Sequence, residues 1–510
     1  MLFSFSQEML LVSTLVVLVS LCLYFRSNRS KNPAMLPIDW PILYRFPSFV
    51  ANLHNLHDYL TVVLAGSGHN FRAHGPPGTG MRFFITCDPA NIRHIFTTNY
   101  ANFPKGALFS AIFDVMAGSL FTIDGDTSHK MHAKAQRFWS SRRIFGSVAA
   151  RSREKVENRL LPFLAHMAGT GTPFDMQELM GRFMLDLTTL MVFGVDPGLL
   201  SPNMPSMDVS DAMDTVMEVG FLRNTIPVAC WKAMRRLNIG PERKLRAAYG
   251  VLLLRRFIEE MMEINAGRDG NDEEKDDIFS DCINDPLYAD HEVLRAMLIG
   301  SLLAGRDTVA TTLTWIFYNL AQNLETVSAI RNELSPIASG KIASGAAGAI
   351  LIFEPDETKS LVYLRAALYE TLRLYPPGPI ERKTVAFNYI MPSGHEVCAG
   401  DSIFVSLHSM GRMEGIWGKD CIDYNPDRWL SKDGSNNLRH IPSHKFLAFN
   451  SGPRTCPGKE IAVMQMKTII AAVVWNFDVE VMEGQTIQPK ASCLLQMKNG
   501  LGVMLRKREM

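Results

Sequence analysis

One cysteine, Cys456, lies in a segment whose residue types suit metal chemistry. Gly452 lies four residues before it and Gly458 two residues after it, within Lys445–Ala462 (KFLAFNSGPRTCPGKEIA). Glycine allows a loop backbone to adopt positive φ and to approach a flat ligand closely. Backbone N–H groups in such a loop support the charge of a thiolate and tune the iron that it binds. We therefore predict that Cys456 is the thiolate ligand of a porphyrin iron.

The neighbours of this cysteine favour that interpretation over two others. Phe449 can pack beside the sulfur, and Arg454 can pair with a porphyrin propionate. The other interpretations are a buried, inert cysteine in a Gly-rich turn and a phosphate-binding loop. The phosphate loop fails because its glycine spacing is different and because Glu460 follows Lys459 where Ser or Thr is needed to hold magnesium.

An acid and a hydroxyl lie next to each other in the middle of a predicted helix. The segment Ala304–Thr308 (AGRDT) falls within His291–Leu324, where apolar residues recur at helical spacing. Gly and Thr weaken a helix centre, which is either a tolerated flaw or an opening over the iron. Because oxygen–oxygen bond cleavage supported by a thiolate needs protons, we predict that Asp307 and Thr308 supply them.

A third constellation combines an acid with two arginines. Glu370 and Arg373 share one face of a helical stretch that ends at Pro376–Pro377. Alone, such a pair is usually a surface ion pair of little energetic value. It becomes informative beside Tyr424–Trp429 (YNPDRW), which supplies Arg428.

Together, these segments resemble the motifs of the cytochrome P450 superfamily. The resemblance implies a mainly α fold with a minor β region, in a single large domain behind an N-terminal transmembrane helix. It implies haem b (iron protoporphyrin IX) as cofactor, O2 as oxidant, and NADPH electrons delivered by a partner NADPH-cytochrome reductase. The implied site residues are the metal ligand Cys456, the catalytic pair Thr308 and Asp307, the haem-contacting Arg454, Arg382, Phe449, Gly452 and Gly458, and the buried structural triad Glu370, Arg373 and Arg428.

The sequence departs from the family pattern at three positions. Ser128 and His132 stand where the family usually has a Trp and an Arg that reach a haem propionate. His132, or Lys130 beside it, is expected to take over this contact. Pro457 stands where the mid-chain alkane hydroxylase subfamily, which the chain resembles, usually has Leu, and a proline removes one N–H from the cysteine loop.

Longer stretches, among them CDPANIRHIFTTNYANFPKG and LYPPGPIERKTVAFNYIMPSGHEV, are similar to the plant clan of fatty-acid ω-hydroxylases. Within that clan they resemble the mid-chain alkane hydroxylase subfamily, which also includes noroxomaritidine synthase. The resemblance therefore implies a monooxygenase or oxidase of small apolar or phenolic molecules. It leaves two substrate classes open, hydroxylation of a long-chain alkane or fatty acid and oxidative phenol coupling of a norbelladine-type alkaloid precursor. The pocket residues expected from family position are Phe109, Phe113, Phe221, Leu303 and Ile380.

A function from another class is a haem sensor or carrier without turnover. Asp307 and Thr308 argue against it, because a carrier has no need of a proton relay. Nucleic-acid binding is not expected, since the net charge of the 510 residues is only +1 and basic residues form no long run. The eight cysteines are scattered without a CxxC pair, so neither a disulfide framework nor a structural zinc site is expected.

The N-terminus differs from the rest of the chain. Met9–Phe25 carries no charge and is followed by Arg26, Arg29 and Lys31. About 20 apolar residues span a bilayer, and a basic flank stays cytosolic. The alternative, a cleaved signal peptide, fits less well because its positive charge would precede the apolar run. The prediction is a single-pass anchor in the endoplasmic reticulum membrane, in contact with membrane lipid, with a cytosolic catalytic domain.

The chain is therefore divided into an anchor (1–30), a proline-rich, non-helical connector (31–50) and a haem-thiolate oxygenase domain (51–510). Exposed loops are expected at Gly267–Asp277 and Ser339–Gly348. Helices are predicted over Arg153–Met167, Phe174–Val195, Leu245–Ile264, His291–Leu324 and Thr358–Leu374. Strands are predicted over Phe83–Thr86, Ser402–Leu407 and Gly500–Leu505.

Overall fold

The computed structural model describes residues 45–201, 204–247, 253–267, 276–346, 350–433 and 437–508. The predicted membrane anchor and most of the connector lie outside these ranges, as does most of the expected loop Gly267–Asp277. Within the described ranges, no helix is both long enough and apolar enough to cross a membrane.

Helices make up most of the described chain. The first half contains α2 (Phe46–Ala51), α3 (Leu56–Gly66), α4 (Pro89–Arg93), α5 (Gly106–Ile112), α6 (Gly125–Ser140), α7 (Arg142–Lys155), α8 (Leu161–Thr170), α9 (Met176–Phe193), α10 (Asp208–Thr225), α11 (Val228–Leu237) and α12 (Gly240–Leu245). The second half contains α13 (Leu253–Ala266), α14 (Ile278–Cys282), α15 (His291–Gln322), α16 (Leu324–Lys341), α17 (Pro355–Lys359), α18 (Val362–Leu374), α19 (Leu407–Met410), α20 (Glu414–Trp417) and α21 (Lys459–Asn476).

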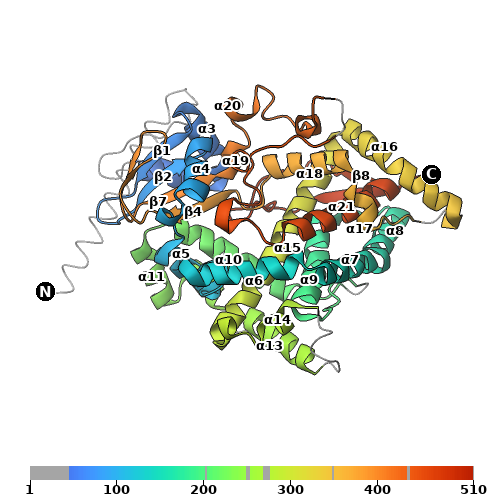
Figure 1. The fold of residues 1–510 in the computed structure, drawn as a ribbon, viewed down its shortest axis with the longest axis horizontal. Coiled ribbons are helices and arrows are strands. Elements are labelled where there is room, and N and C mark those ends of the chain that lie inside the picture. The colour runs from blue at the N-terminus through green and yellow to red at the C-terminus, as the bar shows by residue number, and fades with distance from the viewer. Residues whose placement is uncertain are drawn as a thin grey trace. The chain divides into compact units, whose positions relative to one another are not determined.

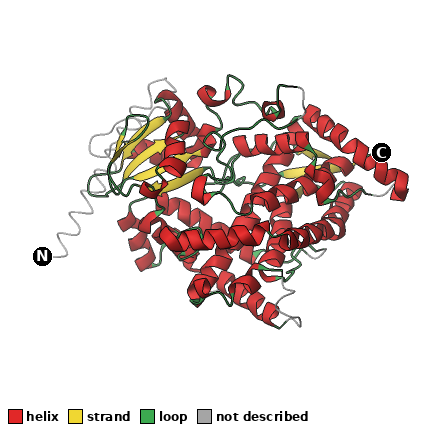
Figure 2. Ribbon diagram, viewed as in Figure 1, coloured by secondary structure: helices red, strands yellow, loops and turns green. Residues whose placement is uncertain are grey.

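The strands form small sheets among these helices (Figure 2). The strands are β1 (Asn70–His74), β2 (Arg82–Thr86), β3 (Phe174–Asp175), β4 (Ile380–Thr384), β5 (Tyr389–Ile390), β6 (Glu396–Val397), β7 (Ser402–Ser406), β8 (Phe477–Val481) and β9 (Gly502–Lys507). The four-stranded sheet has the order β1-β2-β7-β4, the three-stranded sheet β3-β9-β8 and the third sheet β5-β6. In the four-stranded sheet, β2 runs parallel to β7 and β4 antiparallel to it, with Arg382 opposite Phe404.

The long helix α15 packs closely against α9. A Cβ atom at Gly305 would lie 2.7 Å from Cγ2 of Thr188, so only glycine permits this approach. An apolar cluster joins α15 to α8, α9, α16, α18 and α21, and nearly every side chain of α21 after its first turn is buried. Figure 1 shows the four-stranded sheet gathered with α3, α4 and α19, apart from this larger helical part.

Most of the predicted elements are present. β2, β7 and β9 confirm the three predicted strands. Helices occupy most of the five predicted stretches, with breaks at 323 and 360–361. The predicted helix Phe174–Val195 is shorter than expected, because Phe174–Asp175 is strand β3 and α9 ends at Phe193. Part of Leu245–Ile264 lies outside the described residues. Two predictions were wrong. The last residues of the connector form helix α2, because Pro47 occupies the first turn, where its missing N–H costs no hydrogen bond. The predicted loop at Ser339–Gly348 begins as the end of α16, which runs to Lys341.

Candidate functional site

A cavity of about 570 Å³ lies beside the cysteine loop. Its walls include Cys456 and Gly458 from the loop, and Ala304, Asp307 and Thr308 from α15. The cavity is also lined by all five pocket residues predicted from the sequence, which are Phe109, Phe113, Phe221, Leu303 and Ile380. The cavity therefore brings the predicted iron ligand and the predicted proton-delivery pair to one space.

The backbone of the cysteine loop is held tightly. Gly452 has φ +62°, and a Cβ atom there would lie 2.1 Å from the carbonyl oxygen of Phe96, so a side chain cannot be accommodated. The N–H of Cys456 donates a hydrogen bond of 2.8 Å to the carbonyl of Phe449. Phe449 and Gly458 also line the cavity, but at Gly458 a Cβ atom would meet no neighbour. Only the first of the two predicted glycines is therefore required by packing.

Two opposing effects act on the half-buried thiol of Cys456. Burial raises its pKa, whereas the backbone N–H of Gly458 and the charge of Lys459 lower it. The two lowering groups both favour a thiolate. Pro457 lies between Cys456 and Gly458 in the sequence, and it has no backbone N–H to donate to the sulfur.

Asp307 and Thr308 both reach the cavity, but with different partners. One carboxylate oxygen of Asp307 is 2.5 Å from the guanidinium of Arg306, and the other oxygen, Oδ2, is buried without a hydrogen-bond partner. Burial raises the pKa of Asp307, against the charge of Arg306. The Thr308 hydroxyl donates to the carbonyl of Ala304 at 2.7 Å. A carboxyl group with a raised pKa, one unpaired oxygen atom and a neighbouring hydroxyl can accept and release a proton near neutral pH.

Ion pairs connect Asp307 to the protein surface. Arg306, itself buried, binds Asp214 of α10 at 2.9 Å. Lys490 lies 3.6 Å from Asp214 and 2.5 Å from Glu218, whose side chain is 37% exposed. The acid in the cavity therefore belongs to a chain of charged groups that begins at solvent.

A cluster of buried charges lies near Arg454. Its guanidinium binds Asp124 at 2.9 Å, while its Nε has no hydrogen-bond partner. Lys105 pairs with Glu381 at 3.1 Å. Lys383 is fully buried, and burial, then the charge of Lys105, lower its pKa to about 7. Three cations thus face two acids, and the charges of Lys105, Glu381, Arg454 and Asp124 all act on Lys383.

Three cations line the cavity here, namely Arg454, Lys105 and Arg382, and this positive charge fits a porphyrin with its two propionates. A propionate would pair with the unsatisfied Nε of Arg454. Sequence reasoning named Arg454 but missed Lys105 and Lys383. Alternation gave no signal for Lys383, because Arg382 and Lys383 are adjacent in β4 and both are buried.

The two remaining predicted haem contacts, His132 and Arg382, both line the cavity but have different hydrogen-bond partners. His132 lines the cavity, and its Nε2 is 2.7 Å from the carbonyl oxygen of Thr455 in the cysteine loop. Lys130 is exposed and Ser128 is buried away from the cavity, so His132 is the better candidate for the missing arginine's place. Arg382 also lines the cavity, with Asn224 and Ser402 as its partners.

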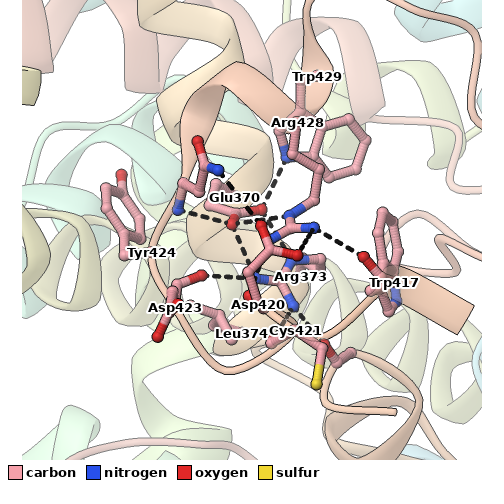
Figure 3. Close-up of polar contacts among 12 residues, drawn as sticks. Glu370, Arg373, Leu374, Trp417, Asp420, Cys421, Asp423, Tyr424, Arg428 and Trp429 are labelled. Carbon is pink, nitrogen blue, oxygen red and sulfur yellow. Dashed lines mark hydrogen bonds and ion pairs between the residues drawn. The ribbon is translucent and has the colours of Figure 1, made fainter. Parts of the chain in front are cut away.

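The structure places the acid and two arginines of the third constellation together (Figure 3). Glu370 receives two hydrogen bonds of 2.7 Å from Arg373 and one of 3.2 Å from Arg428. The indole N–H of Trp429 and the backbone N–H of Asn425 donate to the same carboxylate, each at 2.9 Å. All lone pairs of a fully buried carboxylate are thereby directed to donors, which is the condition for a buried charge to be tolerated.

This cluster is joined to the cysteine loop by aromatic packing. The Trp429 ring lies 4.6 Å from that of Phe446, and Tyr369 of α18 lies 5.5 Å from Phe446. Arg373 also donates to the carbonyls of Cys421 at 2.6 Å and Asp423 at 3.0 Å. The triad therefore fixes the segment before the cysteine loop to α18.

Comparisons with known proteins agree with this geometry. The sequence model of the family Cytochrome P450 matches residues 79–504. Noroxomaritidine synthase 1 of Narcissus pseudonarcissus is 34% identical over 504 residues, covering 98% of this chain and 96% of the relative. Alkane hydroxylase MAH1 of Arabidopsis thaliana is 32% identical over 500 residues, covering 96% of this chain and 97% of the relative. A match of this extent, on a chain with this cysteine loop, shows that the protein belongs to the cytochrome P450 family.

Proposed function

We propose that this protein is a membrane-anchored monooxygenase that hydroxylates an extended apolar molecule, with Cys456 as iron ligand. Its family uses haem, O2 and NADPH-derived electrons delivered by a reductase. The observation that carries the substrate proposal is the composition of the cavity wall. Apolar side chains from four elements outside the cysteine loop line it, namely Phe49 of α2, Phe71 of β1, Phe83 of β2 and Phe404 of β7. A cavity with this lining suits a long alkyl chain.

The haem, when bound, supplies oxygen activation, and the protein positions it and the substrate. Cys456 would hold the iron, and Arg454, Lys105 and Arg382, which all line the cavity, would hold the propionates. Asp307 would exchange protons at the cavity, and Arg306, held by Asp214, would fix the position of its carboxylate. These roles need no acid other than Asp307 at the reacting end of the cavity.

Phenol coupling is the second candidate function. It is supported by the names of four similar proteins, all called noroxomaritidine synthase. A norbelladine-type substrate carries an amine, which is cationic at neutral pH. Among the described wall residues the acids are Asp307 and Glu381, and both are already paired with Arg306 and Lys105. The wall therefore suits a neutral or anionic substrate better than a cationic one.

The membrane anchor is part of the same proposal. The uncharged Met9–Phe25 with its basic flank supports a single-pass anchor in the endoplasmic reticulum membrane, with the catalytic domain in the cytosol. This arrangement would place the cavity near a membrane-bound reductase and near apolar substrates dissolved in lipid.

Product analysis tests the substrate proposal. Microsomes that contain the full chain and a reductase are incubated with NADPH and, separately, with alkanes, fatty acids and norbelladine-type phenols. We expect hydroxylated alkyl products. Coupled phenols without alkyl products would establish the second candidate instead, and the absence of any product despite a normal carbon monoxide spectrum would refute both.

The proton-delivery role of Asp307 predicts a specific kinetic effect. In Asp307→Asn the group that exchanges protons is lost while the size of the side chain is kept. We expect turnover to fall by about 10-fold or more, because a positioned acid–base group typically contributes 100-fold or more and water replaces part of it. The solvent isotope effect on turnover should rise. Unchanged turnover and isotope effect, with normal haem content, would contradict the role.

Replacing Pro457 is expected to change the reduction potential of the haem iron. In Pro457→Leu the loop regains a backbone N–H beside the cysteine, and a new donor to the sulfur would stabilise the thiolate charge. We expect the reduction potential of the haem protein to become more positive, measured by spectroelectrochemical titration. The matched control is Pro453→Leu in the same loop, three residues before the cysteine. Equal potentials in Pro457→Leu and wild type would reject the effect.

A further inference from the structure

Gly220 of α10 lies against the ring of Phe113, which forms part of the cavity wall. Both residues are buried. A Cβ atom at position 220 would lie 2.5 Å from Cε1 of this ring, 3.0 Å from Cζ and 3.3 Å from Cδ1. Carbon atoms attract each other best at about 3.5–4.0 Å, so the shortest of these distances is a clash. The ring of Phe113 therefore occupies the space that any other residue at position 220 would fill.

The backbone on both sides of Phe113 is fixed to the same helix. Arg223, about one turn further along α10, donates hydrogen bonds of 2.8 Å to the carbonyl of Ile112 and to the carboxylate of Asp114. Its side chain is only 1% exposed, and its other two nitrogen atoms donate to Glu242 of α12 at 2.6 Å. Because a buried arginine with acceptors on all three nitrogen atoms is costly to displace, the segment that carries Phe113 cannot move away from α10.

The Phe113 ring has two further aromatic neighbours. Its centre lies 4.9 Å from that of Phe109 and 5.2 Å from that of Phe121, and both of these rings also line the cavity. A close-packed interior offers no empty space to a displaced side chain. A ring that is pushed off α10 can therefore move only into the one open volume that it borders, which is the cavity.

The width of the cavity at this place thus depends on a residue behind its wall. Gly220 itself does not line the cavity, whereas Phe113 does. An alkyl chain with methyl branches is wider than an unbranched chain. When the wall moves inward, the branched chain is the first of the two to be excluded.

We propose that Gly220 is a specificity-determining residue, which keeps the cavity wide enough for branched apolar chains by letting Phe113 pack against α10. This inference rests on the proposed function and deepens it, because it names the width of the extended apolar substrate as the property that the protein selects. Gly220 touches no substrate and acts only through the position of the Phe113 ring.

Spectral titration of the full-length, haem-loaded protein tests this role. Wild type, Gly220→Ala and the double variant Gly220→Ala/Phe113→Leu are titrated with hexadecane and with phytane, which is the same chain with methyl branches along its length. Leucine removes Cε1 and Cζ, the two ring atoms nearest to an added Cβ atom. The matched control is Gly146→Ala in α7, a helical glycine where an added Cβ atom meets no neighbour. Haem content and the carbon monoxide difference spectrum are recorded for every variant.

A role in substrate width predicts a selective loss of affinity. In Gly220→Ala the Kd for phytane should rise by about 10-fold or more and that for hexadecane by less than about 3-fold, because only the wider ligand is forced into an overpacked site. The double variant should bind phytane as tightly as wild type or more tightly. Gly146→Ala should have wild-type Kd values for both hydrocarbons.

Two results would overturn the inference. They are equal changes of both Kd values in Gly220→Ala, and a loss of phytane affinity that persists in the double variant. Should Gly220→Ala fail to bind haem, Phe113→Leu alone decides. It should lower the Kd for phytane relative to that for hexadecane, and an unchanged ratio would refute the role. Failure of the proposed function has a different signature, because wild type would then oxidise neither hydrocarbon.

Discussion

Cys456→Ser is expected to abolish the thiolate-type Soret shift of the reduced carbon monoxide complex and, with it, all substrate oxidation. A serine hydroxyl is not ionised at neutral pH and supplies no soft, electron-rich ligand to iron. In the wild type, the Gly458 N–H and Lys459 both favour the charged form of this sulfur. The measurement is a carbon monoxide difference spectrum of membranes that contain equal amounts of each protein.

A second cysteine of the same cavity provides the control. Cys493 lines the cavity, and burial raises the pKa of its thiol to about 12, so that it remains a neutral thiol. Cys493→Ser should keep the thiolate-type shift. A shift that persists in Cys456→Ser, or that disappears equally in both variants, would refute the assignment of the ligand.

Glu370→Gln is expected to lower the free energy of unfolding by about 3–5 kcal/mol, the cost of breaking a buried ion pair from one side. The substitution leaves Arg373 fully buried and without a carboxylate, and it removes the charge that also binds Arg428 and the Trp429 indole. Because Trp429 packs on Phe446, we also expect the cysteine loop to loosen and haem to be released at lower urea concentration. Urea titration followed by tryptophan fluorescence and by haem absorbance measures both effects.

An exposed ion pair of the same kind serves as the control. Glu157 and Arg153 are 2.9 Å apart, four residues apart in sequence, and each side chain is 39% exposed. Glu157→Gln should cost only about 0.3–0.5 kcal/mol, the usual value of an exposed helical pair. A similar small loss in Glu370→Gln would show that the triad does not brace the haem region.

Motifs within short segments were predictable from the sequence. Spacing within one loop or one helical turn decides which side chains can meet, so Cys456 with its glycines and Glu370 with Arg373 were identified without coordinates. The predicted strands over β2, β7 and β9 follow from the same local logic. The prediction of a non-helical connector is wrong at its end, because Pro47 occupies the first turn of α2, where a proline is compatible with a helix.

Contacts between distant segments were not predictable in this way. The sequence shows Gly305 as a weak point of a helix, whereas in the structure it is the place where α15 packs on Thr188. Lys105 and Lys383 are 278 positions apart in the printed chain, and only folding places both near Arg454. No local pattern encodes which buried charges share a cluster.

By itself, the sequence determined the family motifs, the iron ligand expected at Cys456 and the helical class, because these depend on residue types at short spacing. Only the tertiary structure decided the neighbours of each charged side chain on β4. Adjacent residues of a strand face opposite sides, and what covers each side is set by elements from other parts of the chain. For this reason Lys383 lies with the cations beside the cysteine loop, and Arg382 meets Asn224 of α10 at the cavity wall.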